Sequence, residues 1–205
     1  MLAIIGLGSG CRSTYYAAWE KLGKYKRDLL KDNVQKVRDD QQAATEQFKD
    51  ALTRLRELYR FEGGDLEKVY DRLKAEYDRS TSRADAVKSR IKNVEQISSD
   101  LFAEWAQEAK TISNARLRAD SEEKLRETQR KYDALHAAMK QAEGSMEPVL
   151  RQLRDQVTYL KHNLNAQAVG ALKGEAVDVE REIQQLIHDM NSSIAEAEAF
   201  IRTMP

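Results

Sequence analysis

Apolar residues recur at alternating steps of four and three along residues 30–58, which is the seven-residue repeat of a coiled-coil helix. A second stretch with the same repeat follows a break at residues 62–65. The positions of the first seam are Leu30, Val34, Val37, Gln41, Ala44, Phe48, Ala51, Leu55 and Leu58; those of the second are Leu66, Tyr70, Leu73, Tyr77, Ser80, Ala84, Val87, Ile91, Val94, Ser98, Leu101 and Trp105. The pattern predicts two long helices that fold back on each other.

The break between these seams has the chemistry of a tight helical turn. Glycine is favoured just after a helix because it adopts the left-handed backbone conformation cheaply, and Gly63 and Gly64 stand there. Asp65 can then cap the next helix. A reversal at the glycines places Val34 opposite Val94, so that the two seams match along their whole length.

A second, looser hairpin is predicted from residue 125 onward. Its seams are Leu125, Tyr132, Leu135, Met139, Ala142, Met146, Val149, Leu153, Val157 and Leu160, then Val169, Leu172, Ala176, Ile183, Ile187, Met190, Ile194, Ala197 and Ile201. They match in register if the chain bends near Leu164 and Asn165, although Gly170 and Gly174 are rival break points. Between the two hairpins, Ser113 or Asn114 can cap the third helix.

The predicted fold is therefore all-α: one domain over residues 12–205, an elongated antiparallel coiled-coil bundle of four long helices. Helices of nearly equal length, about 70 Å each, are expected, the first beginning at Tyr15. The alternative is a three-helix, spectrin-like arrangement in which the third helix continues past residue 165. Polar residues at four seam positions, Gln41, Ser80, Ser98 and Thr128, are expected to fix register.

Proline interrupts the third predicted helix. Pro148 lacks an amide hydrogen and crowds the carbonyl of Gly144, which predicts a kink. Gly144 and Pro148 could form a hinge or a bend at which a partner docks; the alternative is a tolerated kink that lets one helix wrap the others.

Composition argues against several classes of function. Lysine plus arginine and aspartate plus glutamate number 34 each, so the chain has no net field to hold a nucleic acid. Cys11 is the single cysteine and cannot form an internal disulfide, and no Cys/His spacing suits a metal. His136, His162 and His188 form no ligand pattern. No nucleophile, base and acid can be assembled, so a non-enzymatic protein without a cofactor is expected.

The first eleven residues, MLAIIGLGSGC, are apolar, then small, then cysteine. This order resembles the end of a bacterial lipoprotein signal peptide, with Cys11 as the acylated first residue of the mature chain. Gly8 stands where leucine is usual, and no lysine or arginine precedes the apolar run. A phosphate-binding glycine loop is the competing interpretation, but no βαβ pattern follows to support it. An unprocessed tail with an ordinary cysteine is the third.

Aromatic and basic residues gather at the end of the predicted first hairpin that lies away from Gly63. The aromatic residues are Tyr15, Tyr16, Trp19, Tyr25, Phe102 and Trp105, and the basic ones are Lys21, Lys24, Lys26, Arg27, Lys110, Arg116 and Arg118. This combination suits a bilayer interface. Trp19, Lys24, Lys26, Arg27 and Trp105 are the predicted membrane-facing residues; the alternative is a core of large residues flanked by solvated charges.

Four segments carry a resemblance that covers nearly the whole chain: Tyr15–Lys21 after Cys11, Gly63–Leu73, Met146–Leu150 and Leu160–Ala166. With them the chain resembles a family of bacterial proteins of unknown function that are commonly described as lipoproteins. The resemblance implies an envelope location and no activity or cofactor. We therefore expect a periplasm-facing lipoprotein, held to the membrane by lipidated Cys11, that acts as a scaffold, spacer or adaptor for a protein partner. The alternative is a cytosolic coiled-coil protein that binds a partner helix.

Overall fold

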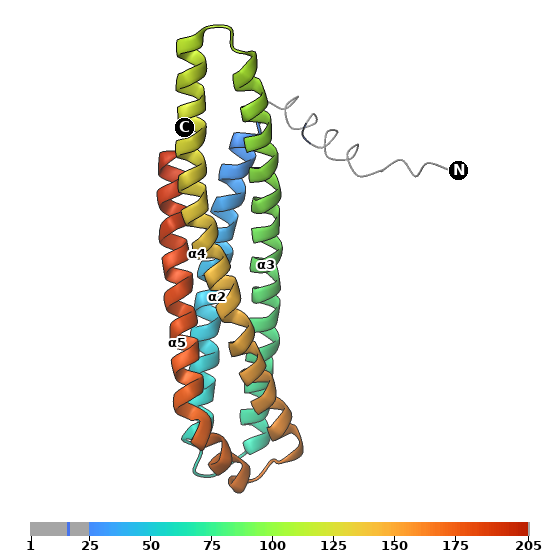
Figure 1. Cartoon of the computed structure of the whole chain (residues 1–205). Helices are drawn as coiled ribbons and strands as arrows, with labels where there is room; N and C mark the ends of the chain where they lie inside the picture. Colours follow the sequence, from blue (N-terminus) through green and yellow to red (C-terminus); the bar gives the residue numbers. More distant parts are fainter. Residues whose placement is uncertain (1–15, 17–24, 205) are drawn as a thin grey trace, which may run out of the picture.

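The computed structural model describes Tyr16 and residues 25–204, and this part of the chain is helical, without strands. Its helices are α2 (Lys26–Tyr59), α3 (Leu66–Thr111), α4 (Ala115–His162) and α5 (Ala166–Thr203). Figure 1 shows that they run alternately up and down side by side. Both α2 and α4 pack against α3 and α5, which makes a four-helix bundle. The predicted fold is confirmed, and the three-helix alternative is wrong because α4 ends at His162.

The three predicted reversals are confirmed, each with a cap that the sequence suggests. Gly64 has a φ of +112° in the α2–α3 turn, and the side chain of Asp65 accepts a hydrogen bond from the amide of Lys68 at 3.2 Å. Asn114 and Asn165 cap α4 and α5 in the same way. These side chains satisfy amides that a helix start leaves without partners. Gly170 and Gly174, the rival break points, lie inside α5.

The predicted seams form the core. Every position of the first seam, from Leu30 to Leu58, is fully buried. The second seam is buried except at Tyr70, Tyr77 and Trp105, which are partly exposed and pack against the core. The hydrophobic repeat therefore faces the neighbouring helices along α2 and most of α3, as a coiled-coil repeat requires.

One seam differs in part from the prediction. In α5 the predicted positions Val169, Leu172, Ile183, Met190 and Ala197 are buried. Leu186, Ser193 and Phe200 are also buried, while Ile187, Ile194 and Ile201, which the sequence suggested, are only partly buried. Ser193 accepts a hydrogen bond from Nε2 of Gln41 at 3.0 Å. A repeat that is read from apolar residues alone selects the isoleucines and misses this pair. The isoleucines flank the seam instead.

The first predicted helix is not continuous from Tyr15 into the seam, because the chain breaks at Tyr25. Its predicted start at Tyr15 lies outside the described residues. The backbone of Tyr25 is extended, with φ −87° and ψ 163°, and α2 begins at Lys26. The side chain of Asp28 stabilises this start by accepting a hydrogen bond from the amide of Tyr25 at 3.1 Å. The helices are therefore unequal: α2 and α5 have 34 and 38 residues, α3 and α4 have 46 and 48.

This inequality gives the bundle two different ends. The closed end carries the α2–α3 and α4–α5 turns, at residues 60–65 and 163–165. At the free end, α3 and α4 run past the first residue of α2 and the last residue of α5 and join through residues 112–114 (Figure 1). Across Tyr16 and residues 25–204, no helix combines the length and the apolar character that spanning a bilayer requires.

Candidate interaction surface

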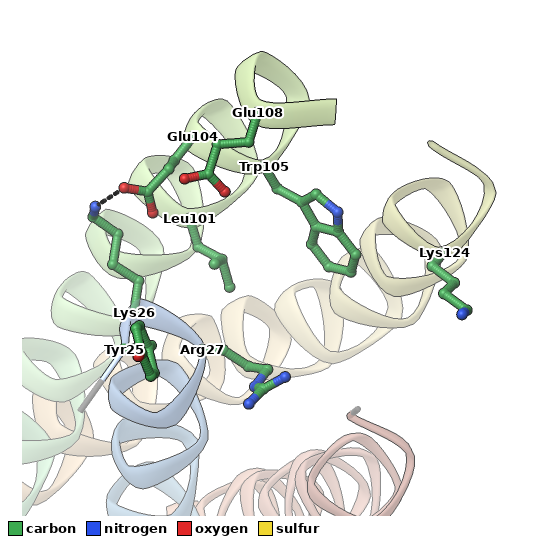
Figure 2. A pocket seen from close by; sticks show the side chains of 8 residues that line it. All are labelled: Tyr25, Lys26, Arg27, Leu101, Glu104, Trp105, Glu108 and Lys124. Carbon is green, nitrogen blue, oxygen red and sulfur yellow. Dashed lines mark hydrogen bonds and ion pairs between the residues drawn. The ribbon is translucent and has the colours of Figure 1, made fainter. Parts of the chain in front are cut away.

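The described residues leave an open space at the free end. A cavity of about 700 Å³ is lined by residues of α2, α3 and α4 together with Tyr25. Figure 2 shows Leu101 and Trp105 projecting from α3 toward this space, while Lys26 reaches across from α2 to Glu104. The lining thus combines an apolar floor with charges of both signs: Lys26, Arg27 and Lys124 against Glu104 and Glu108.

The predicted membrane-facing residues have different environments. Nζ of Lys26 lies 2.5 Å from the carboxylate of Glu104 and 4.7 Å from the ring centre of Tyr16, and its side chain is only 12% exposed. Arg27 is half exposed and lies 3.9 Å from Asp28. Trp105 is partly buried and donates from Nε1 to Ser121 Oγ of α4 at 2.9 Å. Lys26 and Trp105 therefore already have partners inside the protein.

The remaining predicted site residues at this end, Cys11, Trp19 and Lys24, lie outside the described part of the chain. Tyr16 does lie within it. Its hydroxyl donates to Asp100 Oδ2 at 2.7 Å, and the residue is buried. The chain is thus attached to the flank of α3 five residues after Cys11.

A second open groove, of about 590 Å³, lies on the α3–α4 face below this cavity. Its floor is an aromatic cluster in which Tyr132 contacts Phe102 edge to face at 5.5 Å and stacks on His136 at 5.8 Å. The ring of His136 approaches a carboxylate oxygen of Glu95 at 2.8 Å. Burial raises the pKa of Tyr132, which keeps its hydroxyl neutral. The cluster joins α3 to α4 where α2 and α5 end.

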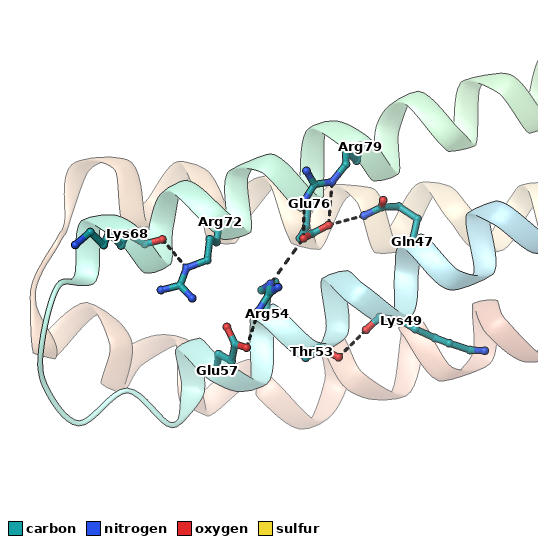
Figure 3. A network of polar contacts seen from close by, with 9 residues as sticks. All are labelled: Gln47, Lys49, Thr53, Arg54, Glu57, Lys68, Arg72, Glu76 and Arg79. Carbon is teal, nitrogen blue, oxygen red and sulfur yellow. Dashed lines mark hydrogen bonds and ion pairs between the residues drawn. The ribbon is translucent and has the colours of Figure 1, made fainter.

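A cluster of buried polar contacts links α2 and α3 toward the closed end. Figure 3 shows the buried carboxylate of Glu76 between Arg79, Gln47 and Arg54. Arg79 donates to both of its oxygens, at 2.6 and 3.2 Å, and Gln47 of α2 donates at 2.6 Å. Burial alone would raise the pKa of Glu76, but these hydrogen bonds and the arginine charges outweigh it and hold the pKa below its usual value.

Two further buried polar contacts cross the bundle. Tyr59 of α2 and Gln156 of α4 exchange hydrogen bonds of 3.1 and 2.8 Å, and burial raises the pKa of Tyr59 to about 12. Asp189 of α5 accepts hydrogen bonds from Gln141 and Ser145 of α4. Such contacts fix which helices are neighbours and in what register.

The contact to Ser145 lies within the predicted hinge. Helix α4 is continuous through Gly144 and Pro148, and α4 curves across the bundle (Figure 1). Ser145 bonds to Asp189 of α5, and Glu147 lies 3.4 Å from Lys88 of α3. Both neighbours of α4 therefore hold the segment in which the proline stands. Whether Gly144 and Pro148 act as a hinge stays a prediction.

The histidines do not form a site. His136 of α4 pairs with Glu95 of α3, His162 is the exposed last residue of α4, and His188 is exposed on α5. Over Tyr16 and residues 25–204, no group of three or more His, Cys, Asp or Glu residues could hold a metal ion.

Fold and contacts together define a four-helix bundle protein in which several buried polar side chains link one helix to another. The chain belongs to the family described as Protein of unknown function (DUF2959), whose model matches residues 15–204. No curated protein and no solved structure matches it. The resemblance drawn from the sequence is thus confirmed as to family.

Proposed function

We propose that this protein is a non-enzymatic lipoprotein of the cell envelope, anchored through acylated Cys11, whose helical bundle acts as a scaffold, spacer or adaptor. The observation that carries the proposal is the attachment of Tyr16 to Asp100. It fixes the chain to the side of a stiff bundle only five residues from the acylation position. A lipid on Cys11 would therefore hold the bundle directly against a membrane rather than at the end of a long linker.

The design of the bundle is consistent with a spacer. Helices of 46 and 48 residues extend about 70 Å. Their seams are filled with buried side chains, and their buried polar groups bond across to neighbouring helices. Such a rod can separate a membrane from a partner at a set distance.

A cytosolic protein that binds a partner helix is the second candidate. It is favoured by the outer face of α5 near the closed end, where Val177 is 75% exposed. Gly170 and Gly174 lie on the same stretch, and a Cβ at either position would meet no other atom. A partner helix could approach closely there.

Membrane fractionation followed by mass spectrometry separates the two candidates. The envelope proposal expects a chain that begins at Cys11 and carries diacylglycerol, recovered with membranes, and a Cys11→Ser chain that is released from them. An intact Met1 in the soluble fraction would contradict it and support the second candidate. Tyr16→Phe serves as the control, because it keeps the acylation position and removes only the hydrogen bond to Asp100.

A further inference from the structure

The α3–α4 turn presents cations and exposed apolar side chains at the outermost point of the free end. We name Lys110, Ile112, Arg116, Leu117 and Arg118 the tip surface. Lys110, Arg116 and Arg118 are exposed, Leu117 is 58% exposed, and Ile112 is partly exposed. Residues 109–119 contain these three cations and no acid. The tip is thus positively charged, although the whole chain is neutral.

These cations differ from those elsewhere on α4. Lys124, Lys131 and Lys140 each lie within 2.7 Å of a carboxylate on their own helix. Within the part of the chain that the structure describes, none of the three tip cations is paired with an acid. Their charge is therefore available to an anionic partner, and the exposed leucine between two arginines gives that partner an apolar contact.

We infer that the tip surface binds the surface of an anionic bilayer, with the three cations among lipid phosphates and Leu117 at the level of the headgroups. Charge complementarity favours this partner, since basic residues next to a membrane are drawn to anionic lipid and an exposed leucine can enter the interface. This membrane contact differs from the one that the sequence suggested. Lys26, which belonged to that surface, forms an ion pair with Glu104, whereas the tip cations are exposed.

The position of the anchor supports the same partner; this step rests on the proposed acylation of Cys11. Five residues, fully extended, let Cys11 reach about 18 Å from Tyr16. Along α3, the tip lies about 18 Å beyond Asp100, the partner of Tyr16, whereas the closed end lies about 50 Å away in the other direction. An anchored bundle that stands upright must therefore stand on its tip, because Cys11 cannot reach a membrane at the closed end.

The test uses the full chain with Cys11→Ser, so that no acyl group contributes. Its probe is vesicles of roughly one part phosphatidylglycerol to three parts phosphatidylethanolamine, compared with phosphatidylcholine alone. Reversing Lys110, Arg116 and Arg118 to glutamate should lower the affinity for the anionic vesicles, measured by co-sedimentation, at least about a hundredfold. Each cation contributes a factor of roughly five to that affinity. The matched control reverses Arg72, Lys161 and Lys173, which are exposed toward the closed end, and should retain binding.

A second readout reports orientation. An environment-sensitive fluorophore on Leu117→Cys should shift to shorter wavelength with anionic vesicles. The same label on Leu164→Cys, an exposed leucine in the turn at the closed end, should not. Binding should also weaken between about 0.1 and 1 M salt, because the screening length falls from about 10 to 3 Å.

Equal losses in the two triple variants, a shift at both labels, or no binding by the parent chain would each overturn the tip proposal. Circular dichroism of every variant confirms that helicity is retained, so that a loss of binding reports the surface. The outcome is separate from the proposed function. If the tip binds vesicles but the chain is never acylated in cells, the tip proposal stands and the lipoprotein proposal is wrong. If the chain is acylated but the tip does not bind vesicles, the lipoprotein proposal stands and the tip proposal is wrong.

Discussion

The two ends of the bundle are packed differently. Toward the closed end, four helices surround the seam, Leu55 and Leu58 are fully buried, and the Glu76 cluster joins α2 to α3. At the free end, two helices continue without the other two, and Leu101 and Trp105 line an open cavity. The same heptad repeat runs through both regions. Burial is thus set by how many helices reach a given level and not by the repeat alone.

This difference in packing suggests that the two ends have different roles. A fully packed half gives the rod its stability and stiffness, because buried apolar area contributes most of the folding free energy. The half with fewer helices keeps side chains partly exposed, and exposed surface is what a membrane or a protein partner can use.

The largest effect is expected from truncating the core of the closed half. Leu55→Ala should lower the free energy of unfolding by about 2 to 5 kcal/mol, because it leaves a cavity among fully buried neighbours. Leu101→Ala should cost less than about 2 kcal/mol, since Leu101 already lines an open cavity and water can replace the lost methyl groups. Urea unfolding of both variants measures the difference. Equal costs would show that the two ends are packed alike.

Polar links should show the same asymmetry. Glu76→Gln should cost about 1.5 to 3 kcal/mol because it weakens charged hydrogen bonds at a buried site. Its counterpart Glu104→Gln, which weakens the partly exposed ion pair with Lys26, should cost less than about 1 kcal/mol. Unfolding free energies near neutral pH compare the two.

The Glu76 effect should depend on pH in a defined direction. The folded state lowers the pKa of Glu76, so its contribution is present above the unfolded pKa of about 4.3 and is lost as the pH falls through the folded value. The difference between the parent chain and Glu76→Gln should therefore shrink below about pH 4. A difference that stays constant down to pH 2 would contradict this assignment.

The sequence reveals the fold and the first hairpin almost completely, since glycines and capping residues mark the turns and apolar residues mark the seam. It misses two features for identifiable reasons. The break at Tyr25 contains no proline, and Asp28 stabilises it through a contact that no repeat records. Ser193 occupies a core position and bonds to Gln41, and that pairing becomes visible only when α2 and α5 are side by side.

The candidate surface is harder to predict than the fold. The sequence places Lys26, Arg27 and Arg116 in one basic group, yet the bundle pairs Lys26 with Glu104 and leaves Arg116 exposed. Which cations stay unpaired depends on register between helices far apart in the chain. The acid-free stretch of residues 109–119 is the local signal that could have identified the tip.

The link between Gln41 and Ser193 lies midway along α2 and should give an intermediate effect. Ser193→Ala removes the hydroxyl that accepts from Nε2 of Gln41 and should cost about 1 to 3 kcal/mol. Adding Gln41→Leu should recover most of this loss, because Oε1 of Gln41 is buried without a hydrogen-bond partner. A double variant that is less stable than Ser193→Ala alone would show that the polar pair stabilises the bundle.

Removing the Tyr59 hydroxyl should have a smaller effect on stability, and its pH dependence should appear in alkali. Its pKa is raised to about 12, so its contribution to stability is complete below about pH 10 and is lost as the pH rises toward 12. Tyr59→Phe should cost about 1 kcal/mol near neutral pH and narrow the alkaline loss. The control is Tyr159→Phe at a tyrosine that is 41% exposed. An equal alkaline loss in the parent and Tyr59→Phe chains would remove Tyr59 as its source.

The smallest effect concerns Gly144, between the two ends. Gly144→Ala should raise the free energy of unfolding by about 0.5 to 1 kcal/mol, because the residue is exposed in a helix and a Cβ there meets no other atom. Gly174→Ala in α5 is the matched comparison and should gain a similar amount of stability.

Hydrogen exchange across residues 140–150 then tests whether the segment around Gly144 and Pro148 is a hinge. If the segment opens as a hinge between the packed half and the free half, Gly144→Ala should slow exchange there more than Gly174→Ala slows it around residue 174. Equal slowing at the two sites would mean that Pro148 is a bend held in place by the contacts of Ser145 and Glu147 with the neighbouring helices.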